Sequence, residues 1–272
     1  MASAKDLRFL FFDLDDTLID HSGAVRLATN LYLHDYREYL PHSPEGFFQE
    51  WCGLIETYYY AYLRGEINYE QQRIYRMQEL YRRQNLYLPD NDAYAHYQRY
   101  LFHYSNNWIL FDDVTPFLEK LELPFGIITN GNAEQQRLKI ELTKLKERAE
   151  PVIISEEIGA GKPDKFIFHE ACRQAGVAPE HTLYIGDRFE ADVLGGKKAG
   201  LSTVWLRRYI GQNTNGSVPF IRSLSELNLN NISSQRFNTQ HYKYAAKIKH
   251  EGKQPLATRR ISLKPVIRNL RK

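Results

Sequence analysis

Two aspartates separated by one residue, Asp13 and Asp15, are the side chains of this sequence best placed to do chemistry. They follow an apolar run over residues 9–12, which predicts a buried strand. In open α/β sheets, ligands bind just outside the carboxyl ends of the strands. At this spacing Asp13 can be a nucleophile while Asp15 acts as acid and base, two roles that one carboxylate cannot fill at once. Isolated acidic pairs are also common in solvated turns, so the prediction depends on three further segments.

The second segment is a predicted strand over residues 125–129 that runs into a polar turn, Asn130-Gly131. The Thr129 hydroxyl and the backbone N–H groups of such a turn, including that of Asn130, can hold phosphate oxygens. An ordinary Asn-Gly turn is the alternative interpretation of the same residues.

The third segment places Lys162 after a glycine-rich stretch and directly before Pro163 and Asp164, which are good helix-start residues. Its charge and the free backbone donors of a helix N-terminus can meet an anion there. A surface lysine in a flexible loop is the alternative. The spacing that defines a P-loop is absent from this stretch.

The fourth segment is a predicted strand over residues 182–186 that ends in Gly186-Asp187. Asp187 can bind a hard cation together with Asp13, and Mg²⁺ suits a site with few carboxylates. Asp192 follows early in the next helix and can orient Lys162 or a metal-bound water. Its alternative role is that of a carboxylate in the first turn of a helix.

These four segments, taken in order, resemble the haloacid dehalogenase-like hydrolase superfamily over roughly residues 7–230. The resemblance implies an α/β fold, a Rossmann-like parallel sheet core with an inserted all-helical cap domain. It also implies Mg²⁺ dependence and an aspartyl-phosphate intermediate. Positioning and charge neutralisation are what phosphoryl transfer requires, so the implied chemistry agrees with the residues.

Carried over residue by residue, the resemblance implies that Asp13 attacks phosphorus and that Asp15 protonates the leaving oxygen and then activates water. Thr129, Asn130 and Lys162 are expected to hold the phosphoryl group. The expected Mg²⁺ ligands are Asp13, Asp187 and the backbone carbonyl of Asp15. An acid at position 15 is typical of the phosphatases and phosphomutases in the superfamily. Its dehalogenases lack an acid there, and its transport ATPases have Thr.

The elements that must position these residues divide the chain into three parts. Residues 1–19 and 105–232 alternate strand and helix patterns, which predicts a parallel sheet. Besides the strands named above, strands are expected over residues 151–155 and 202–206, and residues 223–227 are expected to form a capped final turn of helix. Residues 20–104 show only helical spacing, with breaks that predict four helices. In the family such an insert is a mobile cap, whose closure would exclude water and select substrate.

The predicted cap holds 15 of the 19 tyrosines. Tyr58, Tyr59 and Tyr60 lie on successive faces of one predicted helix, so they cannot all be core. They can line a site for a ring-bearing substrate such as a nucleotide. The interpretation favoured here is that the tyrosines pack the small bundle and its hinge, with hydroxyls reaching water.

The last part, residues 233–272, carries eleven Lys and Arg residues against one Glu, a net charge of +10. Few apolar residues and no sustained period predict a basic, disordered tail. A weak, nonspecific contact with nucleic acid or an anionic surface is the alternative.

The composition of the sequence indicates the class of protein and its expected location. With 43% hydrophobic and 25% charged residues, the sequence is that of a soluble globular protein. It has no apolar stretch of about 18 residues, no visible signal peptide and two cysteines without a disulfide pattern, so we expect no membrane span and a cytoplasmic location. The sequence predicts a Mg²⁺-dependent phosphatase acting on a small phosphorylated metabolite. A phosphomutase using the same site, or a non-catalytic protein that binds nucleic acid through its tail, is the alternative.

Overall fold

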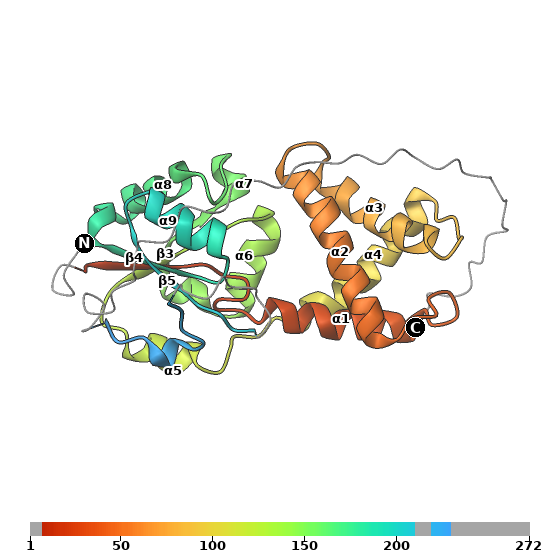
Figure 1. Cartoon of the computed structure of the whole chain (residues 1–272), viewed down its shortest axis with the longest axis horizontal. Coiled ribbons are helices and arrows are strands. Elements are labelled where there is room, and N and C mark those ends of the chain that lie inside the picture. Colours follow the sequence, from red (N-terminus) through yellow and green to blue (C-terminus); the bar gives the residue numbers. More distant parts are fainter. Residues whose placement is uncertain (1–6, 210–218, 230–272) are drawn as a thin grey trace.

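The computed structural model describes residues 7–209 and 219–229. These residues form two parts that lie side by side, a sheet covered by helices and a bundle of four long helices (Figure 1). The basic tail predicted for residues 233–272 lies outside the described residues.

The sheet has five strands in the order β3-β2-β1-β4-β5, and all of its neighbouring pairs are parallel. The strands are β1 (Phe9–Phe12), β2 (Phe125–Thr129), β3 (Ala149–Ile154), β4 (Thr182–Gly186) and β5 (Ser202–Trp205). Phe12 is in register with Ile127 of β2 and with Ile185 of β4. The carboxyl ends of β1, β2 and β4 therefore meet at one edge of the sheet, where the chain order reverses and ligands bind in such folds.

Both faces of the sheet are buried, which explains the continuous apolar runs of its strands. On one face, Phe9 and Phe11 pack with Phe168 of α8, whereas Leu10 and Phe12 on the other belong to the cluster that includes Leu118 of α5. The covering helices are α5 (Val114–Lys120), α6 (Ala133–Leu142), α7 (Ser155–Ile158), α8 (Lys165–Ala175) and α9 (Gly195–Lys198), with a π-helical turn η4 (Phe189–Leu194). The predicted α/β fold with a parallel, Rossmann-like core is confirmed.

Four helices form within residues 21–105, in the segment where helical spacing predicts them. They are α1 (His21–Asp35), α2 (Pro44–Leu63), α3 (Tyr69–Arg82) and α4 (Asp90–Ser105). The side chains of Asp20, Ser43 and Asn68 cap the first three by accepting a backbone N–H. The bundle interior is aromatic, with Trp51 and Tyr32 fully buried. Aromatic packing supplies the apolar area that holds this small bundle together.

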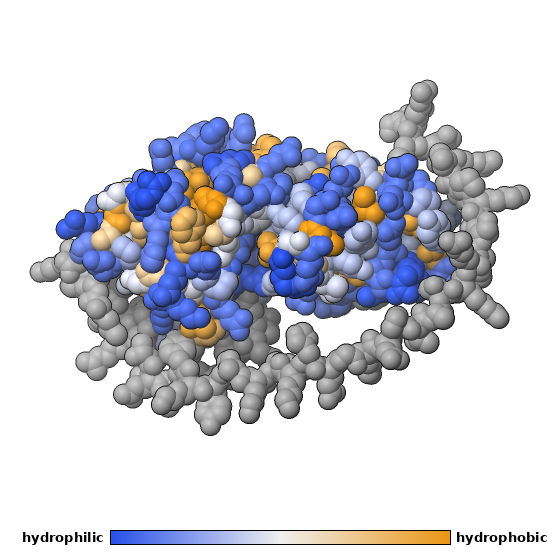
Figure 2. All heavy atoms as spheres, turned by 90° about the horizontal axis from the view of Figure 1, so that it is seen from above, coloured by the Kyte–Doolittle hydropathy of each residue, from blue (hydrophilic) through white to orange (hydrophobic). Residues whose placement is uncertain are grey.

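The chain passes between the two parts twice, through neighbouring segments. Ile19 forms an antiparallel bridge with Leu110, the N–H of Asp20 donates to the oxygen of Ile109 (2.9 Å) and the N–H of Phe111 donates to the oxygen of Leu18 (3.0 Å). On the face that Figure 2 shows, hydrophilic residues predominate on both parts, with groups of hydrophobic residues between them. Within the described ranges, no helix is long and apolar enough to cross a membrane.

Smaller differences from the predicted elements lie at strand ends. β3 starts two residues before the predicted strand, at Ala149, and ends at Ile154 because Ser155 already begins α7. β5 ends at Trp205, while Leu206 forms an isolated bridge with Ile221. The predicted final capped turn is present as a short 3₁₀ helix, η5 (Leu224–Glu226), that Ser223 caps.

Candidate active site

The predicted site residues gather at the carboxyl edge of the sheet, in a cavity of about 720 Å³ between the sheet and the bundle. Asp13 directly follows β1, Thr129 is the last residue of β2 and Asp187 directly follows β4. All three are buried, as is Lys162. The parallel register of the three strands brings together residues that are far apart in the sequence.

Lys162 lies at the centre of the charged groups. Its Nζ is 2.5 Å from Oδ1 of Asp13 and 2.7 Å from Oδ1 of Asp192, and it donates to the Tyr184 hydroxyl at 2.9 Å. Only 8% of the residue is exposed, so the alternative of a surface lysine is wrong. The three N–H donors of the ammonium match these three oxygens.

Asn130 holds Lys162 in this position. The Asn130 Nδ2 donates to the backbone oxygen of Lys162 at 2.9 Å, and the backbone N–H of Lys162 donates to Oδ1 of Asn130 at 2.8 Å. The Asn130 side chain thus joins the turn after β2 to the loop before α8. The backbone N–H of the next residue, Gly131, donates to Oγ of Ser155 at 2.9 Å.

The buried charges shift one another's proton affinities. Burial raises the pKa of Asp13 to about 7, against the opposing effect of Lys162. Burial lowers the pKa of Lys162, but Asp13 and Asp192 outweigh it and raise that pKa to about 12. For Asp187, burial and then the nearby Asp13 and Asp192 raise the pKa well above its usual range. Each shift shows how strongly this site favours an additional positive charge.

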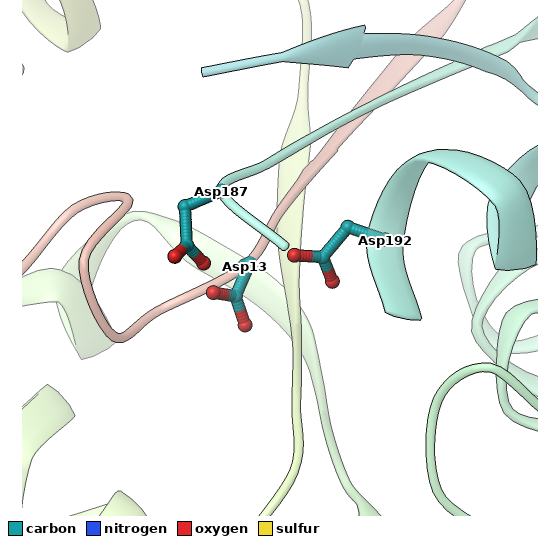
Figure 3. Close-up of side chains that lie close together, drawn as sticks. All are labelled: Asp13, Asp187 and Asp192. Carbon is teal, nitrogen blue, oxygen red and sulfur yellow. The ribbon is translucent and has the colours of Figure 1, made fainter. Parts of the chain in front are cut away.

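Three buried carboxylates form a group that could hold a metal ion. One oxygen from each of Asp13, Asp187 and Asp192 lies within 4.8 Å of the others, and Figure 3 shows the three side chains converging from β1, β4 and η4. The Oδ1 of Asp187 is buried and has no hydrogen-bond partner among the described residues. An oxygen-only, acidic donor set with an unpaired buried oxygen fits Mg²⁺. The Asp15 side chain is not part of this cluster, and the predicted role of its backbone carbonyl stays a prediction.

Asp192 reaches the cluster because residue 186 is glycine. A Cβ at Gly186 would lie 2.5 Å from the Asp192 carboxyl group. Asp192 also accepts from the Tyr184 hydroxyl (2.9 Å) and from the backbone N–H of Arg188 (2.8 Å). It is fully buried within η4 and pairs with Lys162, as the orienting role requires.

Asp15 faces a group of residues that the sequence reasoning missed. Nζ of Lys139 donates to both Asp15 oxygens, at 2.7 and 2.8 Å. Nε2 of Gln136 donates to Asp15 at 3.0 Å and to Oγ1 of Thr129 at 2.7 Å. His21 lies 3.9 Å from the same carboxylate. Burial alone would raise the pKa of Asp15, but Lys139 and His21 hold it down at about 2.

A signal for these residues does exist in the sequence. Gln136 and Lys139 are three apart on α6, so they share one helix face, and α6 starts just beyond the Thr129 turn. A lysine on an amphipathic helix usually faces water, and that expectation hid its role.

The bundle forms the wall of the cavity opposite the sheet, and this wall is rich in tyrosine. Six of them line it: Tyr59, Tyr60, Tyr69, Tyr97, Tyr100 and Tyr104. The hydroxyl of Tyr62 donates to Glu156 at 2.9 Å, that of Tyr69 donates to Gln135, and that of Tyr60 accepts from Arg188. Bundle packing explains the buried tyrosines, as favoured above, and these three hydroxyls in addition form hydrogen bonds to residues of the core.

Comparisons with known proteins agree with this geometry. A sequence model of the haloacid dehalogenase-like hydrolases matches residues 7–200. The pyrimidine 5'-nucleotidase YjjG of Escherichia coli is 42% identical over 106 residues, 38% of this chain and 47% of the relative, so the match spans about half of that protein. Glyceraldehyde 3-phosphate phosphatase of Pyrococcus abyssi is 32% identical over 207 residues, 74% of this chain and 82% of the relative.

A solved structure with the same architecture is that of the HAD-hydrolase YfnB of Bacillus subtilis, described as putative and as bound to magnesium. It superposes with a TM-score of 0.67 at 27% identity and covers 81% of this chain and 96% of its own. Its description also reports interdomain movement.

Proposed function

This chain belongs to the haloacid dehalogenase-like hydrolase family, and we propose that, as a phosphoric monoester hydrolase, it cleaves a small phosphorylated metabolite through a covalent phosphate on Asp13. The observation that carries the proposal is the pairing of a buried aspartate, Asp13, with a partly buried one, Asp15, in a different environment. Asp13 lies among Lys162, Asp187 and Asp192, whereas Asp15 lies against Lys139. Carboxylates in contrasting surroundings can divide the roles of nucleophile and acid/base.

In the first half-reaction, an Asp13 oxygen forms a bond to phosphorus while the bond from phosphorus to the ester oxygen breaks. Asp15 gives the leaving oxygen a proton. Lys162 and the Thr129 hydroxyl hold the phosphoryl oxygens. Mg²⁺, held by Asp13 and Asp187 with Asp192 beside them, supplies charge neutralisation at those oxygens when it is bound.

In the second half-reaction, Asp15 takes a proton from a water molecule, which forms the new bond to phosphorus. The bond between phosphorus and the Asp13 oxygen breaks, and inorganic phosphate leaves. Lys139 donates to both Asp15 oxygens, and these contacts favour the carboxylate form that this step needs. A substrate dianion nearby opposes that effect and raises the proton affinity of Asp15 for the first step.

The proposed substrate class follows from the cavity and the relatives. A volume of about 720 Å³ is suited to a metabolite the size of a sugar phosphate or a nucleotide. The names of the relatives, a nucleotidase and a triose phosphate phosphatase, support small phosphomonoesters. We also propose that the protein acts in the cytoplasm.

The test is phosphate release from a panel of phosphorylated metabolites, with and without a chelator. A chelator should abolish turnover and Mg²⁺ should restore it. Ca²⁺ should inhibit, because it prefers more oxygen ligands at longer distances. Full activity in the chelator would contradict the metal assignment. A phosphomutase would instead convert one phosphate isomer to another without net release of phosphate.

A further inference from the structure

A buried arginine in the bundle wall has no negatively charged partner among the residues that the structure describes. Arg76 on α3 lines the cavity and is only 5% exposed. Its Nε donates to the backbone oxygen of Gln72 (3.2 Å) and its Nη2 donates to the Tyr97 hydroxyl (3.1 Å). Its guanidinium carbon lies 5.1 Å from the centre of the Tyr97 ring. Both hydrogen-bond acceptors are neutral, and the guanidinium has further N–H donors to offer.

The contrast with Arg208 shows what is missing. Arg208 is equally buried in its side chain, and it pairs with both oxygens of Asp113 at 2.7 and 2.8 Å. For Arg76, no carboxylate oxygen of residues 7–209 or 219–229 lies within the 4.0 Å that defines an ion pair. A buried charge without a counter-charge is costly, and arginine cannot lose its proton to escape that cost.

A side-chain oxygen at this end of the cavity also lacks a hydrogen-bond donor among the described residues. Gln72, one turn before Arg76, lines the cavity, and its Oε1 is buried without a hydrogen-bond donor among the described residues. The Gln72 Nε2 donates to the backbone oxygen of Tyr69 at 2.9 Å. This hydrogen bond assigns the nitrogen and oxygen positions of the side-chain amide. The wall therefore offers a cationic donor and, beside it, an acceptor.

The distance from this pair to the reacting groups follows from α4. The rings of Tyr97, Tyr100 and Tyr104 follow one another, with centroids 5.7 and 6.0 Å apart. Arg76 lies at the Tyr97 end, and Lys139, which binds Asp15, lies 5.5 Å from the Tyr104 ring at the other end. Seven residues of helix, at about 1.5 Å each, span roughly 10 Å.

We infer that Arg76 binds a second anionic group of the substrate, a carboxylate or a second phosphate, roughly 10 Å from the phosphorus that Asp13 attacks. A hydroxyl or N–H group next to that anion would meet Gln72. The inference rests on the proposed phosphatase function and names the class of substrate that this same site prefers. It makes Arg76 a specificity residue, distant from the chemistry.

Three hexitol derivatives that differ only at the far end test it. Sorbitol 6-phosphate is neutral there, gluconate 6-phosphate carries a carboxylate and sorbitol 1,6-bisphosphate carries a phosphate. The expected kcat/KM of the wild-type protein is roughly 10- to 100-fold higher for at least one of the two anionic compounds than for the neutral one, the usual worth of a charge-assisted hydrogen bond. Whichever is preferred identifies the anion.

The variant Arg76→Met should bring that ratio close to one, and Arg76→Lys should restore part of it. Arg73→Met is the matched control, because Arg73 also stacks on Tyr97 but does not line the cavity, and it should keep the wild-type ratio. Since the readout is a ratio of substrates, a general loss of folded protein does not move it.

Two failures are distinguishable with p-nitrophenyl phosphate, which has no second anion. Suppose that the protein hydrolyses p-nitrophenyl phosphate but does not prefer the anionic hexitols, or that Arg76→Met keeps such a preference. Either result overturns the role of Arg76 and leaves the phosphatase function intact. The absence of phosphate release from all four compounds overturns the proposed function, and the inference falls with it.

Discussion

The cavity has a floor, formed by the sheet edge with α6, and a wall, formed by the helical bundle. The two differ in whether their charged side chains are paired. On the floor, the sheet edge, Asp13, Asp15, Lys139 and Lys162 each have an oppositely charged partner within 3 Å. On the wall, the bundle, tyrosines dominate and the buried Arg76 has no carboxylate beside it among the described residues. Paired charges fix geometry before a substrate arrives, whereas unpaired donors are open for one.

This difference assigns separate tasks to the two regions. The floor should perform the same chemistry on every phosphomonoester, so its variants should lower kcat for all of them. The wall should choose among them, so its variants should change ratios between substrates and the ease of closure.

Asp13→Asn should abolish turnover of every substrate, a loss of at least about 10⁴-fold, because no covalent phosphate can form without the nucleophile. The measurement is phosphate release, with intact mass after an acid quench to look for a phosphate-sized increment on the wild-type chain. Asp112→Asn, at an exposed position, is the control and should be fully active. Appreciable activity of Asp13→Asn on any substrate would show that another residue is the nucleophile.

Asp15→Asn should slow hydrolysis of alkyl phosphates by roughly 10²–10⁴-fold, the usual worth of a positioned acid and base. Aryl phosphates have better leaving groups and need less acid assistance in the first step. The phosphorylated form of Asp13 should therefore accumulate on an aryl substrate, visible by mass spectrometry. Equal losses on both substrate types with no adduct would argue against this role.

Lys139→Met should lower kcat by roughly 10- to 100-fold, because the partly buried Asp15 carboxylate loses the buried ammonium that orients it. If Lys139 acts through Asp15, the same change in the Asp15→Asn protein should cost little more, so the two effects will not add. Kinetics of the four proteins in this cycle are the measurement. Lys146→Met, exposed and beyond α6, is the matched control. Additive losses would place Lys139 in a separate role.

On the wall, Tyr62→Phe combined with Tyr69→Phe should lower kcat/KM by roughly 3- to 10-fold. Each change removes a hydroxyl that donates to the core, to Glu156 or to Gln135, and so weakens the closed arrangement. Tyr87→Phe is the control, since Tyr87 is 77% exposed. A loss confined to kcat with an unchanged KM for all substrates would instead assign these tyrosines to the floor's task.

The smallest effect concerns stability in acid. Burial lowers the pKa of His96 from 6.5 to about 4, and Nδ1 of this ring lies within hydrogen-bond distance of the hydroxyls of Tyr32 (2.7 Å) and Tyr81 (3.1 Å) inside the bundle. Between those two pH values the unfolded chain holds a proton that the folded chain lacks. The free energy of unfolding should therefore fall as the pH drops through that window, by at most about 1.4 kcal/mol per pH unit.

Urea unfolding at several pH values measures this slope. His96→Gln should flatten it, whereas His34→Gln, at an exposed side chain, should not. An unchanged slope in His96→Gln would mean that other groups dominate acid sensitivity.

The sequence predicts the floor better than the wall, for a physical reason. Asp13, Thr129 and Asp187 each lie at the carboxyl end of a strand. Because parallel strands align these ends, local sequence patterns suffice to predict that the three residues meet. Lys139 was missed because its burial depends on how α6 docks on the sheet. The six lining tyrosines come from helix faces, and only the packing of α2, α3 and α4 decides which faces meet the core. The apolar periodicity of a helix predicts its buried side but not the neighbour that buries it.

The two short segments that join the parts also bear on how the chain folds. β1 ends at Phe12 and its neighbour β2 begins at Phe125, so the first strand pair of the core must close a very long loop. The bridge between Ile19 and Leu110 brings the two ends of the bundle together. If the bundle forms first, only residues 13–18 and 111–124 remain between the bridge and the two strands, and the entropy of closure falls accordingly. Local helical contacts form faster than distant strand pairs. The bundle would then act as the folding nucleus that aligns the sheet, and substitutions that loosen it should slow refolding of the core.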